Sequence, residues 1–229
     1  MNRAVILAGG SGSRAGGEIP KQFVLVEEKP IIAYTIEVFN NHPLIDDIIV
    51  VSKEEYVNSV IVIKTKYNFH KVSKVVAGGK ERFESSIAAI NSCENGDDND
   101  ILLFHDCARP LVSDKIITDC LDAMKHHDAV TVAIPATDTL YFSEDLRHIN
   151  MIPSRKNFLN AQTPQCFRLK TIKTAYSLAK KDPEFLPSDD CSIIKRYIPT
   201  CDIFIVEGDC RNFKITYKQD IELFKLLLN

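Results

Sequence analysis

The 229-residue chain lacks several features that would place it in large classes of protein. It has seven cysteines but no CxxC pair, and a chain of this length does not need disulfides to fold, so these cysteines predict free thiols in a reducing compartment. No apolar run approaches the ~20 residues of a membrane span. The apolar residues 4–8 are followed at once by glycine and serine, which excludes a signal-peptide core. We therefore expect a cytoplasmic protein without a membrane anchor.

An excess of basic residues is also absent. The chain has 28 Lys and Arg against 31 Asp and Glu, a formal net charge of -3, which argues against a nucleic-acid-binding protein. An anionic ligand would have to be met by local cations. The hydrophobic content of 45% is that of an ordinary globular protein, and the length allows one sizeable core. We expect residues 1–229 to form a single domain without repeats or low-complexity segments.

Short apolar runs typical of strands alternate with segments whose apolar residues have helical spacing. The predicted strands are Ala4–Leu7, Ile48–Val51, Lys74–Val76, Ile101–Phe104, Ala129–Ala133 and Cys201–Val206, and the predicted helices are Ile31–Asn40, Glu54–Tyr67, Glu81–Asn91 and Ser113–His126. This alternation predicts an α/β fold with a mostly parallel sheet and helices on both faces.

One segment breaks the alternation. Between Pro135 and Phe158 the pattern changes to two short strand-like pieces, Thr139–Phe142 and Ile149–Ile152, around a charged turn. This pattern predicts an antiparallel excursion out of the main sheet, an arm at about 137–158. An isolated two-stranded arm is only marginally stable in water, so we expect it to pack on another surface.

A glycine-rich turn follows the first predicted strand in the sequence AVILAGGSGSRAGGEIPKQF. Gly9, Gly10 and Gly12 let a ligand approach the backbone, whose N–H groups can bind phosphate oxygens. A tight strand-to-helix turn without a ligand would use the same glycines. The Walker pattern is absent, because no Gly-Lys-Ser/Thr closes the loop.

Two cations flank this turn. Arg14 and Lys21 would surround a ring of backbone donors, an arrangement that suits a triphosphate, and Pro20 would stiffen the approach to Lys21. A nicotinamide-binding protein would need a cleaner glycine fingerprint and an acidic residue after the second strand, where Ser52 and Lys53 stand.

Polar groups follow the other predicted strands, and the carboxyl ends of parallel strands meet at one edge of a sheet. Asp106 in HDCARP can hold Mg²⁺ between phosphates, although a buried structural aspartate is the alternative. Ser85 and Ser86 in GGKERFESS can bond a base edge. EGDCRNFKIT adds Lys214 and Asp209; whether Asp209 is a second metal ligand stays open. Singly these charges would be solvated surface groups, but their recurrence predicts one site.

Four motifs in chain order carry a resemblance to a known family. They are LAGGSGSR with PKQF near the N-terminus, HDCARP at 105–110, AQTPQ at 161–165 and RNFKIT at 211–216. The chain resembles the cytidylyltransferases that activate small polyol phosphates, from about residue 3 to about residue 225. This group includes the 2-C-methylerythritol 4-phosphate enzymes of isoprenoid synthesis and the ribitol 5-phosphate enzymes of cell-wall and capsule synthesis.

The resemblance implies a Rossmann-like nucleotidyltransferase with CTP and Mg²⁺ as ligands and a β-arm exchanged in a homodimer. It implies catalytic, phosphate-binding roles for Arg14, Lys21 and Lys214 and a metal-binding role for Asp106. The nucleotide-binding positions that it implies are Ala8, Gly9, Gly10, Gly12, Gly79, Ser85 and Asp106. The acceptor-binding positions are Arg109, Thr139, Arg155 and Thr163, with Arg155 reaching across from the partner subunit.

The chemistry needs no general base or covalent intermediate. A phosphate monoester has a second pKa near 6 and is already an anionic nucleophile at neutral pH. Fixed cations and Mg²⁺ stabilise the charge that builds during attack on the α-phosphorus. We therefore interpret His105 as a structural hydrogen-bonding group and Cys107 as a small buried residue.

Two residues that depart from the pattern of the methylerythritol enzymes predict the acceptor. The methylerythritol enzymes usually carry a basic residue where Thr137 stands and an aspartate where Lys80 stands, so the sequence favours D-ribitol 5-phosphate. 2-C-Methyl-D-erythritol 4-phosphate stays open as an acceptor. A non-catalytic nucleotide-binding regulator is the alternative from another class, but it would not need both Lys21 and Lys214.

Overall fold

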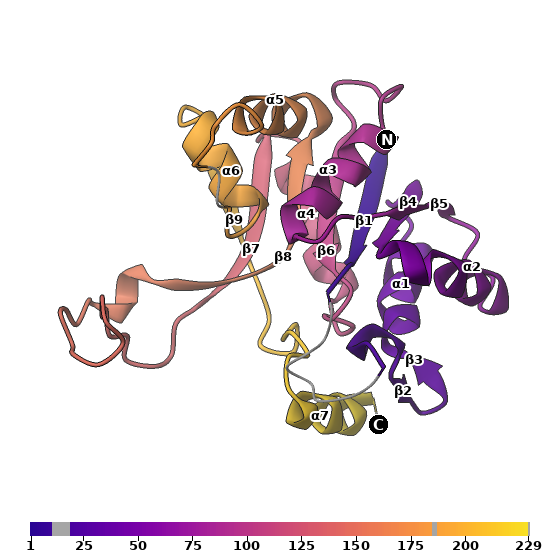
Figure 1. Cartoon of the computed structure of the whole chain (residues 1–229), viewed down its shortest axis with the longest axis horizontal. Helices are drawn as coiled ribbons and strands as arrows, with labels where there is room; N and C mark the ends of the chain where they lie inside the picture. Colours follow the sequence, from indigo (N-terminus) through magenta and orange to yellow (C-terminus); the bar gives the residue numbers. More distant parts are fainter. Residues whose placement is uncertain (11–18, 185–186, 229) are drawn as a thin grey trace.

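The computed structural model describes residues 1–10, 19–184 and 187–228. Its centre is a seven-stranded sheet in the order β5-β4-β1-β6-β8-β7-β9 (Figure 1). The strands are β1 (Asn2–Ala8), β4 (Asp47–Ser52), β5 (Val72–Ala77), β6 (Ile101–Asp106), β7 (Ala129–Pro135), β8 (Leu159–Arg168) and β9 (Ile203–Glu207). All pairs are parallel except those of β8, which runs antiparallel to both β6 and β7.

Alternating side chains of β1, an inner strand of the sheet, face two separate cores. In β1, Ala4 and Ile6 belong to one hydrophobic cluster and Val5 and Leu7 to the other, as the period of two in a strand requires. Helices α1 (Ile31–Asn41), α2 (Val57–Lys66) and α4 (Asp114–Ala123) cover the first face. Helices α3 (Arg82–Ser92), α5 (Leu169–Ala179) and α6 (Asp190–Tyr197) cover the second. The predicted α/β fold with helices on both faces is confirmed.

A third cluster closes the carboxyl end of the sheet. The short hairpin of β2 (Leu25–Val26) and β3 (Lys29–Pro30) packs with helix α7 (Lys218–Leu228) through Val26 and Phe224, and Ile31 at the start of α1 belongs to the same cluster. The 3-10 turn η2 (Lys21–Phe23) precedes this hairpin. Two further 3-10 turns are η3 (Glu54–Tyr56), which leads into α2, and η4 (Arg155–Asn157), which precedes β8. None of the described helices has the length and apolar character that crossing a membrane demands.

All six predicted strands and all four predicted helices are present, but the hairpin strands β2 and β3 and the helices α5, α6 and α7 were not predicted. In the main sheet, strand β8 was missed. Its sequence, LNAQTPQCFR, carries buried polar side chains and a proline instead of an apolar alternation. The pairing with β7 shifts register between Thr131 and Val132, which leaves Thr163 and Pro164 out of the ladder. Such a bulge redirects a side chain, and here it turns Thr163 toward the end of β6.

The predicted arm projects from the sheet between β7 and β8 (Figure 1). The two strand-like pieces expected within it, Thr139–Phe142 and Ile149–Ile152, were wrong as strands, because the described arm pairs only through the isolated bridge Phe142–Met151. A side chain pairs with the backbone N–H groups of the turn: Asp145 Oδ1 accepts hydrogen bonds from those of Arg147 and His148. Because no second layer of the described chain covers the arm, further hydrogen-bonded pairing between its two sides would add little stability.

Candidate active site

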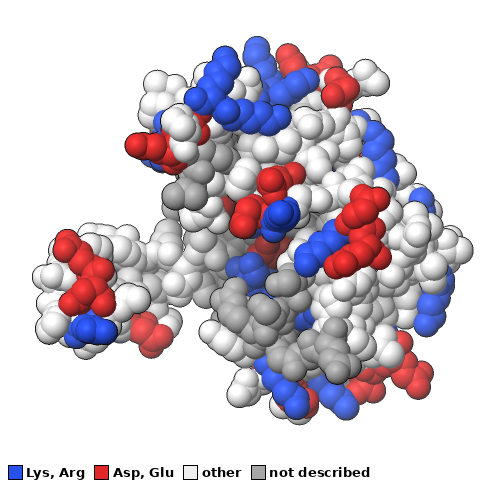
Figure 2. Space-filling view, viewed as in Figure 1, with Lys and Arg blue, Asp and Glu red and all other residues white. Residues whose placement is uncertain are grey.

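A pocket of about 330 Å³ opens at the carboxyl end of β1, β4 and β6. Its described lining includes seven of the predicted site residues: Gly9, Gly10, Lys21, Gly79, Ser85, Asp106 and Lys214. The described cations of the lining outnumber its acids: Lys21, Lys53, Lys80, Arg82 and Lys214 stand against Glu81 and Asp106. Figure 2 shows acidic and basic side chains gathered at the centre of this face of the main body. A chain of net negative charge therefore presents a locally cationic pocket.

The two predicted glycine turns meet at Ser85. A Cβ added to Gly9 would lie 3.1 Å from Ser85 Oγ, and one added to Gly78 would overlap the same atom. Ser85 is buried in the first turns of α3, and the bare glycines let both backbone turns approach it. Ser86 is fully buried and does not belong to the described lining, so its predicted contact with a ligand stays a prediction.

Gln22, which was not predicted, fixes the first glycine turn. Its buried side-chain amide donates hydrogen bonds to the carbonyl oxygens of Ala8, at 2.9 Å, and Gly10, at 3.1 Å. Ala8 is fully buried at the end of β1 and lies behind the lining. The predicted Gly12 and Arg14 fall outside the described residues, so their roles stay predictions.

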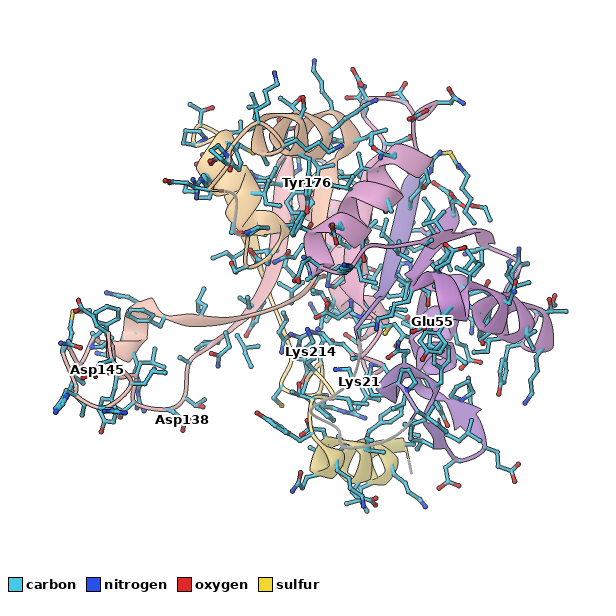
Figure 3. All side chains as sticks on the ribbon, viewed as in Figure 1. Lys21, Glu55, Asp138, Asp145, Tyr176 and Lys214 are labelled. Carbon is cyan, nitrogen blue, oxygen red and sulfur yellow. The ribbon has the colours of Figure 1, made fainter. Side chains whose placement is uncertain are left out.

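Two lysines enter the pocket from opposite ends of the sequence. Lys21 lies in η2, and its ammonium donates a 2.7 Å hydrogen bond to the carbonyl oxygen of Ile215. Lys214, the neighbour of Ile215, points into the same region, and Figure 3 shows both lysines directed toward the space below the sheet. The contact between η2 and loop 208–217 thus holds the two cations together.

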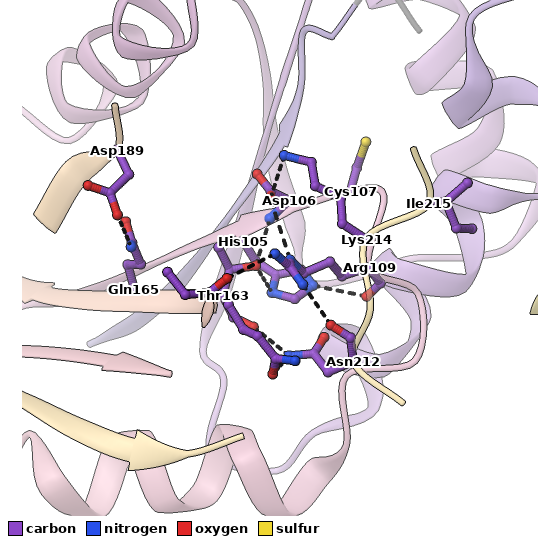
Figure 4. Close-up of polar contacts among 12 residues, drawn as sticks. His105, Asp106, Cys107, Arg109, Thr163, Gln165, Asp189, Asn212, Lys214 and Ile215 are labelled. Atoms are coloured by element: carbon purple, nitrogen blue, oxygen red, sulfur yellow. Dashed lines mark hydrogen bonds and ion pairs between the residues drawn. The ribbon is translucent and has the colours of Figure 1, made fainter. Parts of the chain in front are cut away.

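Asp106 at the end of β6 is the anion on which this site is centred. Lys214 Nζ lies 3.0 Å and Arg109 Nε 3.5 Å from its Oδ2 (Figure 4). Arg82 Nε lies 3.8 Å from its Oδ1. Burial by itself would raise the pKa of Asp106, but the charges of Lys214, Arg82 and Arg109 outweigh it and hold the pKa well below its usual range. The carboxylate is therefore ionised at neutral pH.

A chain of hydrogen bonds supports Asp106 from behind. Thr163 Oγ1 accepts the backbone N–H of Asp106 at 3.2 Å and lies 3.0 Å from His105 Nδ1. His105 Nε2 lies 3.1 Å from the carbonyl oxygen of Arg109. Since a carbonyl can only accept, Nε2 carries the proton and Nδ1 accepts from the Thr163 hydroxyl. Thr163, predicted to contact the acceptor, here orients the end of β6.

Neither His105 nor Cys107 is suited to transfer protons or to attack. His105 is completely buried, and burial lowers its pKa to about 4, so the ring is neutral. Burial raises the pKa of the Cys107 thiol to about 12, which keeps it protonated. Both observations agree with the structural roles expected from the sequence.

Arg109 bonds protein carbonyls instead of facing the pocket. Its Nη1 donates to Asn212 at 2.7 Å and its Nη2 to Ala161 at 3.4 Å, which joins the loop after β9 to strand β8. Burial lowers its pKa, and Asp106 opposes that shift. Its predicted contact with the acceptor stays a prediction.

The two site residues predicted on the arm lie away from this pocket. Thr139 and Arg155 are exposed, and Arg155 Nη1 donates a 2.7 Å hydrogen bond to the carbonyl oxygen of Thr137 on the same arm. Figure 3 places the arm, with Asp138 and Asp145, well to the side of Lys21 and Lys214. Within one chain the structure does not bring the arm residues to the site.

Sequence reasoning missed Arg82 and Lys53 in the lining. Arg82 lies inside the GGKERFESS motif, one helical turn before Ser85, so its position after the second glycine turn was the available signal. Lys53 directly follows β4, where its strand-end position could have indicated it. Asp209 is exposed and does not line the pocket.

The residues present fit a metal ion that is bound jointly with a phosphorylated ligand. In the described part of the chain, no group of three or more His, Cys, Asp or Glu side chains could hold a metal by itself. Mg²⁺ usually takes one or two carboxylates and completes its coordination with phosphate oxygens and water. The ionised carboxylate of Asp106 on the pocket wall supplies such a ligand.

Sequence comparison identifies the relatives of this chain. The profile of the 2-C-methyl-D-erythritol 4-phosphate cytidylyltransferase (IspD) family matches residues 3–229. The chain is 37% identical to the enzyme of that name from Thermobifida fusca, over 98% of this chain and 92% of the relative. It is 38% identical to the bifunctional ribulose 5-phosphate reductase/CDP-ribitol pyrophosphorylase Bcs1 of Haemophilus influenzae, over 96% of this chain but 46% of the relative.

Solved structures agree with this assignment. The 4-diphosphocytidyl-2C-methyl-D-erythritol synthase of Anaerococcus prevotii matches with a TM-score of 0.85 at 25% identity, over 99% of this chain and 95% of that one. The Francisella tularensis 2-C-methyl-D-erythritol 4-phosphate cytidylyltransferase matches with a TM-score of 0.82 at 29% identity, over 99% of both chains. With the site geometry, these matches show that the chain is a CTP-dependent nucleotidyltransferase of the IspD family.

Proposed function

We propose that this enzyme transfers CMP from CTP to the phosphate of a small polyol, giving a CDP-polyol and pyrophosphate. The observation that carries the proposal is the meeting of Lys21, Lys214 and the ionised Asp106 in one pocket with both glycine turns. Backbone donors and several cations around one carboxylate suit a triphosphate and a metal, and the family's names supply cytidine as the nucleoside.

The reaction can proceed without proton transfer by the protein. A monoester oxygen of the acceptor forms a bond to the α-phosphorus of CTP, while the bond from that phosphorus to the bridging oxygen of pyrophosphate breaks. Because the attacking oxygen is already anionic near neutral pH, the neutral His105 and the protonated Cys107 are not required.

The chain's own residues stabilise charge and fix positions. Lys21 and Lys214 place ammonium groups where negative charge builds on the transferred and departing phosphates. Mg²⁺ bound by Asp106 and the triphosphate would supply further neutralisation of that charge. Lys214 also contacts Asp106, so the same lysine links the metal-binding carboxylate to the phosphates.

The acceptor is the finer part of the proposal, and two polyol phosphates are candidates. Thr137 and Lys80, the departures from the methylerythritol pattern, favour D-ribitol 5-phosphate, and one relative is named a CDP-ribitol pyrophosphorylase. The family name and other similar relatives favour 2-C-methyl-D-erythritol 4-phosphate. The ribitol interpretation is not better supported by these comparisons.

The arm supports a homodimer as part of the same proposal. It exposes a set of large apolar side chains with relative accessibilities of 41% to 92%: Tyr141, Phe142, Leu146, Ile149, Met151, Ile152, Phe158 and Leu159. A second copy of the arm would cover this surface, as a two-fold interface does. Arg155, which lies far from the pocket of its own chain, would then be able to reach the pocket of the other.

The test is pyrophosphate release from CTP with a panel of acceptors. We expect release with D-ribitol 5-phosphate or 2-C-methyl-D-erythritol 4-phosphate, and none when the same polyol lacks its phosphate. The kcat/KM ratio of the two phosphates assigns the acceptor. Absence of pyrophosphate with every polyol phosphate, while CTP still binds, would contradict CMP transfer and leave a nucleotide-binding protein.

A further inference from the structure

The backbone is held on both sides of Lys214 in loop 208–217. On one side, Asn212 is completely buried. On the other side, Ile215 is completely buried, and its backbone N–H donates a 2.8 Å hydrogen bond to the carbonyl oxygen of Ala108. The side chain of Lys214 is 41% exposed, so its own packing holds it only in part. The position of its ammonium therefore depends on how the loop on either side is held.

The side-chain amide of Asn212 joins this loop to strand β8. Its Nδ2 donates hydrogen bonds to the carbonyl oxygen of Thr163, at 2.9 Å, and to Gln162 Oε1, at 3.2 Å. The backbone carbonyl of Asn212 accepts the 2.7 Å hydrogen bond from Arg109 Nη1 (Figure 4). Three hydrogen bonds thus tie Asn212 to β8 and to the segment that follows β6.

The neighbours of Asn212 fix the orientation of its amide. The Thr163 carbonyl can only accept, so the atom that faces it is Nδ2. Gln162 Nε2 donates a 2.8 Å hydrogen bond to the carbonyl oxygen of Asp209, which turns its Oε1 toward Asn212. A Cβ added to Gly208 would overlap this Oε1, so the glycine leaves room for the arrangement. Position 212 therefore requires a donor, and an aspartate of the same shape would turn an oxygen toward two oxygens.

Thr163 connects Asn212 to the carboxylate that Lys214 contacts. Its hydroxyl accepts the backbone N–H of Asp106, and its carbonyl accepts the amide of Asn212. Lys214 Nζ lies 3.0 Å from Asp106 Oδ2. The bulge of β8 therefore places both members of this ion pair, Asp106 directly and Lys214 through Asn212. Such support from surrounding groups is what an accurately placed functional side chain requires.

The cost of burying this amide indicates that it does more than add stability. Among the described residues no donor pairs with Asn212 Oδ1, although this atom is buried. A buried acceptor without a partner lowers stability. An apolar side chain would avoid that cost but could not donate to Thr163. The amide is therefore explained better by where it holds the loop than by the stability that it adds.

We propose that Asn212 is a positioning residue for Lys214, which fixes loop 208–217 to the bulge of β8 so that the ammonium stays beside Asp106 and the phosphates. The inference rests on the proposed function for the identity of the phosphorylated ligand. Asn212 lies outside the described pocket lining and acts only through the lysine two residues further along the chain. Gln162, which holds the other side of the amide, supports it.

The experiment is a double-mutant cycle between positions 212 and 214. It is measured as kcat for pyrophosphate release and as the dissociation constant of CTP, by calorimetry in Mg²⁺ buffer without any acceptor. Asn212→Ala should lower kcat about 20-fold and Asn212→Asp about 50-fold, and both should weaken CTP binding about 5-fold. When Lys214→Ala is already present, Asn212→Ala should change neither quantity by more than about 2-fold, because the lysine that it positions is absent.

A second buried asparagine provides a matched control. Asn40, at the end of α1, is also buried, and its Oδ1 accepts a 3.1 Å hydrogen bond from the backbone N–H of Lys71, away from the pocket lining. Asn40→Ala should lower the urea concentration at which the protein unfolds, as Asn212→Ala does. Its kcat and its CTP dissociation constant should stay within about 2-fold of the parent values.

The outcomes separate this inference from the proposed function. Normal kcat and CTP binding in both Asn212 variants would overturn the inference. So would an equal effect of Asn212→Ala with and without Lys214, because a purely structural role would be additive. If the parent enzyme releases no pyrophosphate, the proposed function fails, and the cycle in CTP binding still decides the inference. Should Asn212→Asp fail to fold, Asn212→Ala and Gln162→Met decide it, the latter with an expected loss of about 3-fold in kcat.

Discussion

The pocket and the arm differ in what each leaves unsatisfied. In the pocket, side chains from β6, α3 and the loop after β9 converge on one carboxylate, and its described charges are mostly cationic. In the arm, the described contacts are local, such as those of Asp145 with His148 and of Arg155 with Thr137. Its large apolar side chains are exposed instead.

This difference indicates what each region needs to bind. A pocket whose cations outnumber its acids is completed by an anion, and the enzyme's triphosphate substrate is one. An arm with exposed apolar side chains and a single bridge is completed by another apolar surface. Charge therefore predicts the ligand of the first region, and hydrophobic area predicts the partner of the second.

The largest effect should come from removing the charge at the centre of the pocket. We expect Asp106→Asn to lower kcat about 1000-fold, equivalent to about 4 kcal/mol of transition-state stabilisation, while the fold persists. Steady-state pyrophosphate release over a range of Mg²⁺ checks this, and excess Mg²⁺ should restore activity only partly. Full activity of the parent enzyme in EDTA would contradict the metal-binding role. Asp119→Asn, on the exposed face of α4, is the control.

The next largest effect concerns the cations. Lys21→Ala and Lys214→Ala should each lower kcat about 100-fold, about 3 kcal/mol, and Arg14→Ala should behave similarly. Circular dichroism must show an intact fold, and Lys125→Ala on the surface should have normal kinetics. Near-normal turnover in all three variants would show that the pocket's positive charge does not act on the reaction.

The stability of the protein should depend on pH through His105, which is buried behind the pocket. Because burial lowers the pKa of His105 from 6.5 to about 4, the unfolded chain binds more protons between these values, and stability falls as the pH falls from 6.5 toward 4. The contribution is at most about 3 kcal/mol. Urea unfolding at several pH values gives the free energy of unfolding, which should change less with pH in His105→Gln than in the parent enzyme. The glutamine keeps a donor for the Arg109 carbonyl. The pKa of Asp106 is also lowered, so its contribution to stability is fully present above the ordinary aspartate range and is lost only as the pH falls below that range.

The smallest effect should come from a substitution on the arm. It tests directly whether the arm, unlike the pocket, is completed by a second subunit. Arg155→Lys should raise the KM for the acceptor about 10-fold and leave that for CTP nearly unchanged, because a lysine does not reproduce a bidentate phosphate contact. Arg147→Lys, also on the arm, is the matched control. Light scattering should show a dimer for the parent enzyme. A fully active monomer, or equal losses for both substrates, would show that the arm does not complete the acceptor site.

Much of the candidate site followed from strand ends, since parallel strands deliver their following residues to one edge of the sheet. Gly9, Asp106 and Lys214 line the pocket for this reason. The places of Arg82 and Gln22 in the site could not be predicted from the sequence, because an arginine in a helix and a buried glutamine have many structural uses. Thr163 was placed by family resemblance, but its actual contact with His105 depends on a bulge that no pattern in LNAQTPQCFR reveals.

By itself the sequence determined the alternation of strands and helices, the two-sided core and the turns that can bind phosphate. Local periodicity and glycine chemistry are short-range properties, so they can be read without the fold. Only the tertiary structure decided that β8 runs antiparallel between β6 and β7, and that three cations surround Asp106. Those facts depend on contacts between residues far apart in the chain, such as Arg82 with Asp190, and each arises only when the whole sheet has formed.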